Sequence, residues 1–291
     1  MAVIRNTQRS TSLIRWLSRL ALLLLGAWAL AAAAGPLPLA VARLALGRRL
    51  LAERRLSLHN NLACLDCHQP ALGYSDGRAV ATADGLNTPT FYGLASRTSF
   101  GWFSPEVPSL EAFILRPLAN PREMGPLSES TLSQLRGDPA LYAAYAAAFP
   151  HQPVLVTWEQ TAQALALALR AMPTPPPAPL TPTVQRGQAL FAELGCAACH
   201  RGPTLSSEAY FNTGVSADQP RNRGLARVPS LLGLAQTAPY FHDGSAATLA
   251  DVVRAYERGG MAHGPALSPA ISPFVISAAE RADLVAFLAS R

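Results

Sequence analysis

The sequence contains no lysine, so arginine supplies all 24 of its basic side chains. Charged residues make up only 14% of the 291 positions and apolar residues 49%, a composition that excludes a disordered protein. The net charge of +6 does not indicate a nucleic-acid-binding protein, because four of the arginines lie among the first 34 residues, which contain no acidic residue. The other 20 arginines face 18 acidic residues and leave no basic stripe for a phosphate backbone, so we expect no nucleic-acid partner.

Residues 1–34 have the pattern of an export signal. Their arginines precede an uncharged stretch from Leu20 to Ala42 that is first leucine-rich and then alanine-rich. A basic start, an apolar middle and small residues at a possible cleavage site are typical of a secretory signal peptide. The stretch is also long enough to span a bilayer, so a retained N-terminal membrane anchor is the alternative, although Pro36 and Pro38 would interrupt that helix. In both cases we expect the rest of the chain to lie in the periplasm.

Cysteine is scarce, and all four cysteines fall in two copies of one motif, CLDCH and CAACH. The first copy consists of Cys64, Cys67 and His68 and the second of Cys196, Cys199 and His200. Two thiols at this spacing, followed at once by histidine, are typical of covalent haem c attachment, in which the histidine binds the iron. The two pairs are 129 residues apart, too far for a zinc ribbon, and a redox dithiol would not explain the histidine after each pair. The sequence therefore predicts two covalently bound haem c groups.

A proline-rich segment divides the chain into two halves. Residues 173–182 read PTPPPAPLTP, a stiff connector between an N-terminal haem domain at 35–172 and a C-terminal haem domain at 183–291. Gly47 and Gly187 each stand three residues before a leucine, ahead of the two haem motifs, which suggests a duplicated module that opens with a helix. Capping signals predict helices that begin after Thr157, Thr248 and Ser277. We expect a mainly α protein made of two cytochrome c-like haem domains.

Further short motifs occur in a fixed order around the two attachment sequences. They are NTPT at 87–90, FGW at 100–102, NPREMG at 120–125, VPSL at 228–231 and TAPYFHDGS at 237–245. From about Leu46 to the C-terminus, this order resembles the bacterial di-haem cytochrome c peroxidases and their relative MauG. The resemblance implies a peroxidase-family oxidoreductase that reacts with hydrogen peroxide.

The resemblance also implies a role for each haem. The haem of His68 would react with peroxide, and the haem of His200 would transfer electrons. Glu123 would be the distal acid–base group, because cleavage of the O–O bond needs a proton moved from one oxygen to the other. Trp102 would relay electrons between the haems; an insertion after it makes Phe103 the alternative, but indole is easier to oxidise than phenyl.

Two further sites are implied by the resemblance. Asn87, Thr237 and the carbonyl of Pro239 would hold a Ca²⁺ between the haems, and neutral oxygen ligands are admissible for this ion. The sixth ligand of the second haem is a methionine in the peroxidases and a tyrosine in MauG. Counting along the predicted helix favours Tyr256 and leaves Met261 as the alternative.

The loop after the first haem motif differs from that of many di-haem peroxidases. Those enzymes have a distal histidine in this loop and must displace it before peroxide can bind. Residues 69–87 contain neither a histidine nor a methionine, so we expect the first haem to be open to peroxide. His59 and His151 remain as remote candidate ligands. An open iron favours an enzyme over a non-enzymatic electron carrier. The leading prediction is a peroxidase that takes electrons from a small c-type cytochrome or a cupredoxin. The alternative is a MauG- or MbnH-like enzyme that oxidises Trp or Tyr residues of a partner protein.

Overall fold

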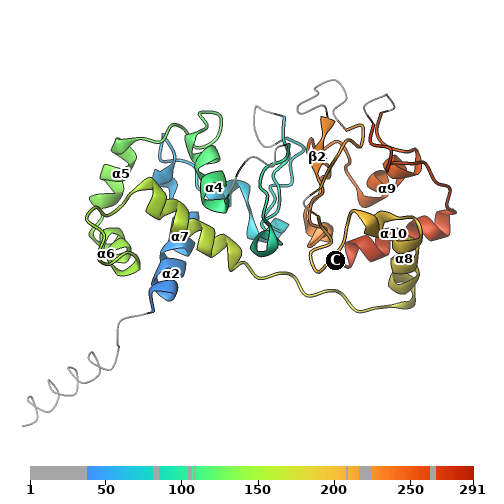
Figure 1. Cartoon of the computed structure of the whole chain (residues 1–291), viewed down its shortest axis with the longest axis horizontal. Helices are drawn as coiled ribbons and strands as arrows, with labels where there is room; N and C mark the ends of the chain where they lie inside the picture. The colour runs from blue at the N-terminus through green and yellow to red at the C-terminus, as the bar shows by residue number, and fades with distance from the viewer. Residues whose placement is uncertain are drawn as a thin grey trace, which may run out of the picture.

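The structure, a computed structural model, describes residues 38–80, 85–103, 107, 109–207, 209–215, 224–262 and 267–291. The export segment predicted for residues 1–34 lies outside these ranges. Helices dominate the described residues, which confirms the predicted mainly α class, and two groups of helices flank a central region of loops (Figure 1). No helix within the described ranges is long and apolar enough to cross a membrane.

The N-terminal group of helices packs on one hydrophobic core. Its elements are α2 (Leu39–Leu51), η1 (Arg54–Leu56), α3 (Cys64–Cys67), η2 (Pro70–Leu72), η3 (Leu94–Ser96), α4 (Leu110–Ala119), α5 (Glu129–Arg136), α6 (Pro139–Ala148) and α7 (Trp158–Arg170). Leu46, Leu141 and Leu165 are almost fully buried where α2, α6 and α7 meet. α2 crosses α7 at Gly47, where a Cβ atom would lie 1.9 Å from the carbonyl oxygen of Ala164. Only glycine permits so close an approach.

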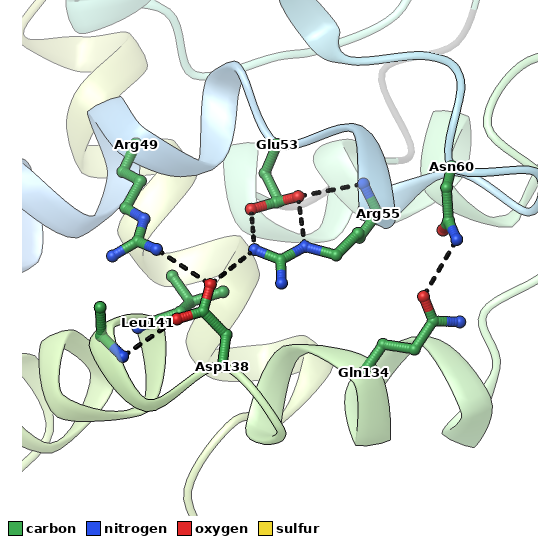
Figure 2. Close-up of polar contacts among 8 residues, drawn as sticks. Arg49, Glu53, Arg55, Asn60, Gln134, Asp138 and Leu141 are labelled. Carbon is green, nitrogen blue, oxygen red and sulfur yellow. Dashed lines mark hydrogen bonds and ion pairs between the residues drawn. The ribbon is translucent and has the colours of Figure 1, made fainter.

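Polar contacts fix the end of α2 against the start of α6 (Figure 2). One carboxylate oxygen of Asp138 accepts from the amides of Ala140 and Leu141, both at 3.0 Å, and so caps α6. Its other oxygen accepts from Arg49 at 3.2 Å and from Arg55 at 3.0 Å. One aspartate therefore both starts a helix and joins it to a distant segment of the chain.

The C-terminal group repeats the close helix crossing. Its elements are α8 (Pro182–Glu193), η4 (Cys196–Ala198), β1 (Tyr210–Phe211), β2 (Ala226–Arg227), η6 (Leu234–Gln236), α9 (Leu249–Glu257) and α10 (Ala278–Ala289), and β1 pairs antiparallel with β2. α8 crosses α10 at Gly187, where a Cβ atom would lie 2.0 Å from the carbonyl oxygen of Asp283. The corresponding positions of Gly47 and Gly187 in the sequence thus have one physical cause. In each half, a glycine on the first helix allows a later helix to pack against it at short distance.

The predicted helix starts are confirmed. Thr157, Thr248 and Ser277 each accept a hydrogen bond from the amide three residues ahead, at the first turns of α7, α9 and α10. Between α7 and α8 the proline-rich segment contains no helix or strand and passes from the end of α7, beneath the central loops, to the start of α8 (Figure 1).

Candidate functional site

Each CxxCH sequence forms a short helical turn. In α3 the amide of His68 donates to the carbonyl of Cys64 at 2.8 Å, and at η4 the amide of His200 donates to the carbonyl of Cys196 at 2.9 Å. The histidine therefore directly follows the turn that carries the two thiols. All four cysteines of the chain lie in the described ranges and are free thiols. They are available for thioether bonds to a porphyrin.

The two histidines are held in the same way. Nδ1 of His68 lies 3.1 Å from the carbonyl oxygen of Tyr74, and Nδ1 of His200 lies 3.0 Å from that of Leu205. Both acceptor residues are in the left-handed region, with φ of 61° for Tyr74 and 48° for Leu205. Non-glycine residues adopt this conformation at a cost, so the surrounding structure must impose it. The left-handed backbone turns each carbonyl toward the histidine, where it can accept a hydrogen bond from Nδ1. The other ring nitrogen, Nε2, is then left to bind an iron ion.

The protonation of both histidines suits an iron ligand. Burial lowers the pKa of His68 to about 4 and also lowers the pKa of His200. Both rings are therefore neutral near pH 7, with Nδ1 donating to the carbonyl. Two thiols and one neutral, oriented imidazole in each half fit a covalently bound haem c.

The backbone and hydrogen bonds that hold each histidine form a frame, and this frame continues in a further pair of matching hydrogen bonds. The hydroxyl of Ser75 donates to the carbonyl of Thr88 at 3.3 Å, and the hydroxyl of Ser206 donates to that of Val228 at 2.8 Å. A proline follows each acceptor, so the loops after the two attachment turns are corresponding parts of one repeated unit.

A cavity of about 260 Å³ adjoins the second attachment turn. Cys196, Cys199 and His200 lie in its wall. The wall also contains apolar side chains of the C-terminal group, among them Phe191, Leu231, Leu249, Val253 and Leu284, and the arginines Arg97 and Arg227. An apolar wall with a few polar groups is typical of cofactor sites and suits a porphyrin that carries two propionates.

The structure separates the two candidates for a sixth ligand. Among the described residues that line this cavity, Tyr256 is present and Met261 is not, and Met261 is 37% exposed. Burial, with a smaller effect of the neighbouring Cys196 and Cys199, raises the pKa of Tyr256 to about 12. The phenol therefore lies near the thiols of the second attachment turn.

Trp102 lies where the two halves meet. The amide of Arg227 on β2 donates to the carbonyl of Trp102 at 2.8 Å. Trp102 also lines the cavity beside His200, whereas Phe103, which the structure also describes, does not. Both rings contact buried His242, with centroids 6.1 Å apart for Trp102 and 5.1 Å for Phe103.

The three predicted calcium ligands, Asn87, Thr237 and Pro239, all line the cavity beside His200. Asn87 donates from its side chain to the carbonyl of Pro239 at 2.6 Å, and Thr237 lines the same cavity. Oδ1 of Asn87 is buried and has no hydrogen-bond partner among the residues that the structure describes. An unsatisfied buried oxygen beside backbone carbonyls fits a cation with neutral ligands, and an exchange of the amide N and O positions would bring Oδ1 toward Pro239. Within the described residues there is no cluster of three acidic, His or Cys side chains, so such a cation would depend on neutral oxygens.

Glu123 is oriented by its own turn. Asn120 donates from Nδ2 to Oε1 of Glu123 at 2.8 Å and accepts from the amide of Arg122 at 3.0 Å. Glu123 is half-buried, whereas Arg122 is exposed. The pKa of the Cys67 thiol is raised mainly by burial and then by the negative charges of Asp76, Asp66 and Glu123, in decreasing order.

Some contributors to the site could not be identified from the sequence. Tyr74 and Leu205 act through backbone carbonyls, which every residue carries, so no residue type marks them. The two remote ligand candidates, His59 and His151, have exposed side chains.

Comparison with known proteins agrees with this geometry. A family model for di-haem cytochrome c peroxidase matches residues 41–176, and one for cytochrome c matches residues 184–291. The methylamine utilization protein MauG of Methylorubrum extorquens is 31% identical over 278 residues, covering 86% of this chain and 78% of MauG. The cytochrome-c peroxidase IdrP1 of Denitromonas iodatirespirans is 28% identical, covering 86% of this chain and 81% of that protein. A crystal structure of a MauG-like protein associated with microbial copper homeostasis has a TM-score of 0.77 at 29% identity, covering 86% of this chain and 89% of that one.

Fold and site together define a di-haem c-type oxidoreductase. The chain belongs to the family of the di-haem cytochrome c peroxidases and MauG. Its predicted cofactor, covalently bound haem c, follows from this membership.

Proposed function

We propose that this protein is an exported enzyme in which hydrogen peroxide reacts at the haem held by His68 and oxidising equivalents pass through Trp102 to the haem held by His200. When bound, haem supplies the oxidation–reduction chemistry, and the protein supplies orientation and proton transfer. The observation that carries the proposal is the repeated frame around the two histidines, since it prepares two iron ligands in one chain. Export is supported by the pattern of residues 1–34.

We assign proton transfer to Glu123. A carboxylate fixed near the peroxide can take the proton of the inner oxygen and deliver it to the outer oxygen, which then leaves as water. The hydrogen bond from Asn120 supports this role, because it fixes one carboxylate oxygen of Glu123 in place.

Trp102 is the residue that we assign to electron relay. Its position in the wall of the cavity beside His200, at the seam between the halves, supports this role over Phe103. Its backbone is held by Arg227, which is itself buried. A Ca²⁺ held by Asn87, Thr237 and Pro239 would fix the same seam.

The electrons, we infer, come from Trp or Tyr side chains of a partner protein rather than from a small cytochrome or cupredoxin. The presence of Tyr256 in the cavity wall supports this donor, because a methionine ligand raises the potential of a haem, whereas tyrosine is the haem ligand of catalase. The 31% identity to MauG supports it as well. A peroxidase with a cytochrome donor is the second candidate, supported by the 28% identity to IdrP1.

The test begins with the mature di-haem protein and peroxide alone. We expect a prompt optical change that is long-lived and extends into the near infrared, and we expect Glu123→Gln to slow its formation about 10²- to 10⁴-fold, as for loss of a general acid–base group. Glu129→Gln is the matched control, since the side chain of Glu129 is 73% exposed. A wild-type protein that does not respond to peroxide would contradict the proposal.

The donor is then decided by products. Mass spectrometry of periplasmic proteins after incubation with enzyme and peroxide should reveal Trp or Tyr oxidation in one partner. Fast turnover of reduced cytochrome c without such a product would establish the second candidate instead.

A further inference from the structure

Aromatic rings form a chain that starts at the iron-binding histidine of the first half. Phe91 stacks on the ring of His68 with centroids 4.0 Å apart. Tyr74 lies 5.5 Å from Phe91, and Tyr92 meets Tyr74 edge to face at 5.4 Å. Tyr74 is also the residue whose carbonyl accepts from Nδ1 of His68. One oxidisable phenol, Tyr74, therefore lies next to the histidine, and a second, Tyr92, lies next to Tyr74. Neither belongs to the contacts of Trp102 described above.

The second half provides an internal comparison. The hydrogen bonds of Ser75 and Ser206 correspond, so Tyr74, which precedes Ser75, corresponds to Leu205. The loops that contain the two acceptors read TPTFYG at 88–93 and VPSLLG at 228–233. In this alignment Phe91 corresponds to Leu231 and Tyr92 to Leu232. All three leucines lie in the described residues. Because leucine satisfies the packing of the same frame around His200, packing alone does not require three aromatic side chains around His68.

The surroundings of the two phenols differ. Tyr92 is only 8% exposed and packs against Gly233 of the other half, where a Cβ atom would lie 2.6 Å from its ring. Burial raises the pKa of Tyr92, with a smaller effect of Tyr74, so the two phenols are close to each other. Tyr74 is partly exposed, so its proton can reach water.

We propose that Tyr74 and Tyr92 form a second outlet for oxidising equivalents, on the histidine side of the first haem and separate from Trp102. This inference rests on the proposed function, which supplies peroxide as the oxidant. Tyr74 gives one electron to the oxidised haem and its phenolic proton to water, and becomes a neutral phenoxyl radical. Tyr92 then gives one electron and one proton to Tyr74, which restores that phenol and moves the radical to Tyr92. Each passage removes one of the two oxidising equivalents that a peroxide molecule delivers, so the outlet lowers the oxidation level of the haem by one electron when no partner protein is bound.

The experiment uses the mature di-haem protein, treated with peroxide in the absence of any donor. The test variant is Tyr74→Phe combined with Tyr92→Phe, which keeps both rings and the Tyr74 carbonyl. The control variant is Tyr142→Phe, since Tyr142 is 43% exposed on α6 and lies outside this cluster. The measurements are the tyrosyl radical signal in freeze-quenched samples, oxygen gained on tryptic peptides, and bleaching of the haem absorption over repeated peroxide additions.

We expect a radical signal and oxygen on the peptides of Tyr74 and Tyr92 in the wild type and in the control, and loss of the signal with faster bleaching in the double variant. Should the double variant fail to bind both haems, single Tyr92→Phe is used, and the radical should then remain on Tyr74. An equal radical signal and equal bleaching in wild type and variant would overturn the outlet while leaving the proposed function intact. A wild type that does not react with peroxide would overturn both.

Discussion

The side-chain amide of Asn87 donates to the backbone carbonyl of Pro239 at 2.6 Å, across 152 positions of the sequence. The same amide lies 3.3 Å from the carbonyl of Phe241, and the backbone amide of Asn87 donates to the carbonyl of His242 at 2.8 Å. One buried residue of the N-terminal half thus holds three carbonyls of the C-terminal half. Its Oδ1 has no hydrogen-bond partner among the described residues, so this oxygen is available to a cation.

Asn87→Ala should weaken this junction. Loss of the side-chain hydrogen bonds to Pro239 and Phe241, whose carbonyls would be left without this donor, should lower the free energy of unfolding by about 1–3 kcal/mol. Thermal unfolding with added Ca²⁺ and with chelator should show a stabilising effect of Ca²⁺ in the wild type and none in Asn87→Ala. Gln163→Ala, at an exposed position of α7, should behave like the wild type. Equal stabilisation of Asn87→Ala by Ca²⁺ would mean that any cation site lies elsewhere.

The helix crossings predict a sharp contrast between two glycines. Gly187→Ala would place a Cβ atom 2.0 Å from the carbonyl oxygen of Asp283, so α8 and α10 must separate, at a cost of about 1–3 kcal/mol. Gly137→Ala is the control, because the nearest atom to its Cβ would be at 3.5 Å and its φ is −71°. That substitution should be neutral or stabilising by up to about 1 kcal/mol. Denaturant unfolding measures both, and equal effects would contradict the crossing.

The parts of the structure that follow from short-range patterns could be predicted from the sequence. The starts of α7, α9 and α10 depend on a hydroxyl and a partner three residues ahead, and the attachment turns depend on the CxxCH spacing itself. The orientation of the Tyr74 and Leu205 carbonyls could not be predicted in this way. The left-handed backbone of these residues is imposed by contacts made elsewhere in the chain. The contact of Arg227 with Trp102 depends on how the two halves meet, which no local pattern records.

The ion pair between Arg186 and Asp283 predicts a pH dependence of stability. The guanidinium contacts both carboxylate oxygens, at 2.6 and 2.9 Å, and holds the pKa of Asp283 below its ordinary value of 3.8. A lowered carboxyl pKa contributes stability above the pKa of the unfolded state, and this contribution is lost as the pH falls through the folded value.

Asp283→Asn should therefore make the protein less stable near neutral pH and flatten the loss of stability below about pH 4. Unfolding free energies measured from pH 7 downward provide the test. Glu129→Gln, which removes a carboxylate that is 73% exposed and paired with Arg136, is the control for the loss of one surface carboxylate. If the acid slope of Asp283→Asn equalled that of the wild type, the pair would not be formed in solution.

The place of Tyr256 in the cavity wall leads to a spectroscopic prediction. If its phenol oxygen binds the second iron, Tyr256→Phe removes that ligand, and the resting spectrum of the second haem should change toward that of a five-coordinate, high-spin iron. Tyr256→Met should instead raise the reduction potential of that haem, since a thioether favours the reduced iron. Met261→Leu, at a position 37% exposed and outside the described cavity wall, should leave both the spectrum and the potential unchanged. A spectrum altered by Met261→Leu and unaltered by Tyr256→Phe would instead identify methionine as the ligand, and would favour a cytochrome-fed peroxidase over the modification of a partner protein.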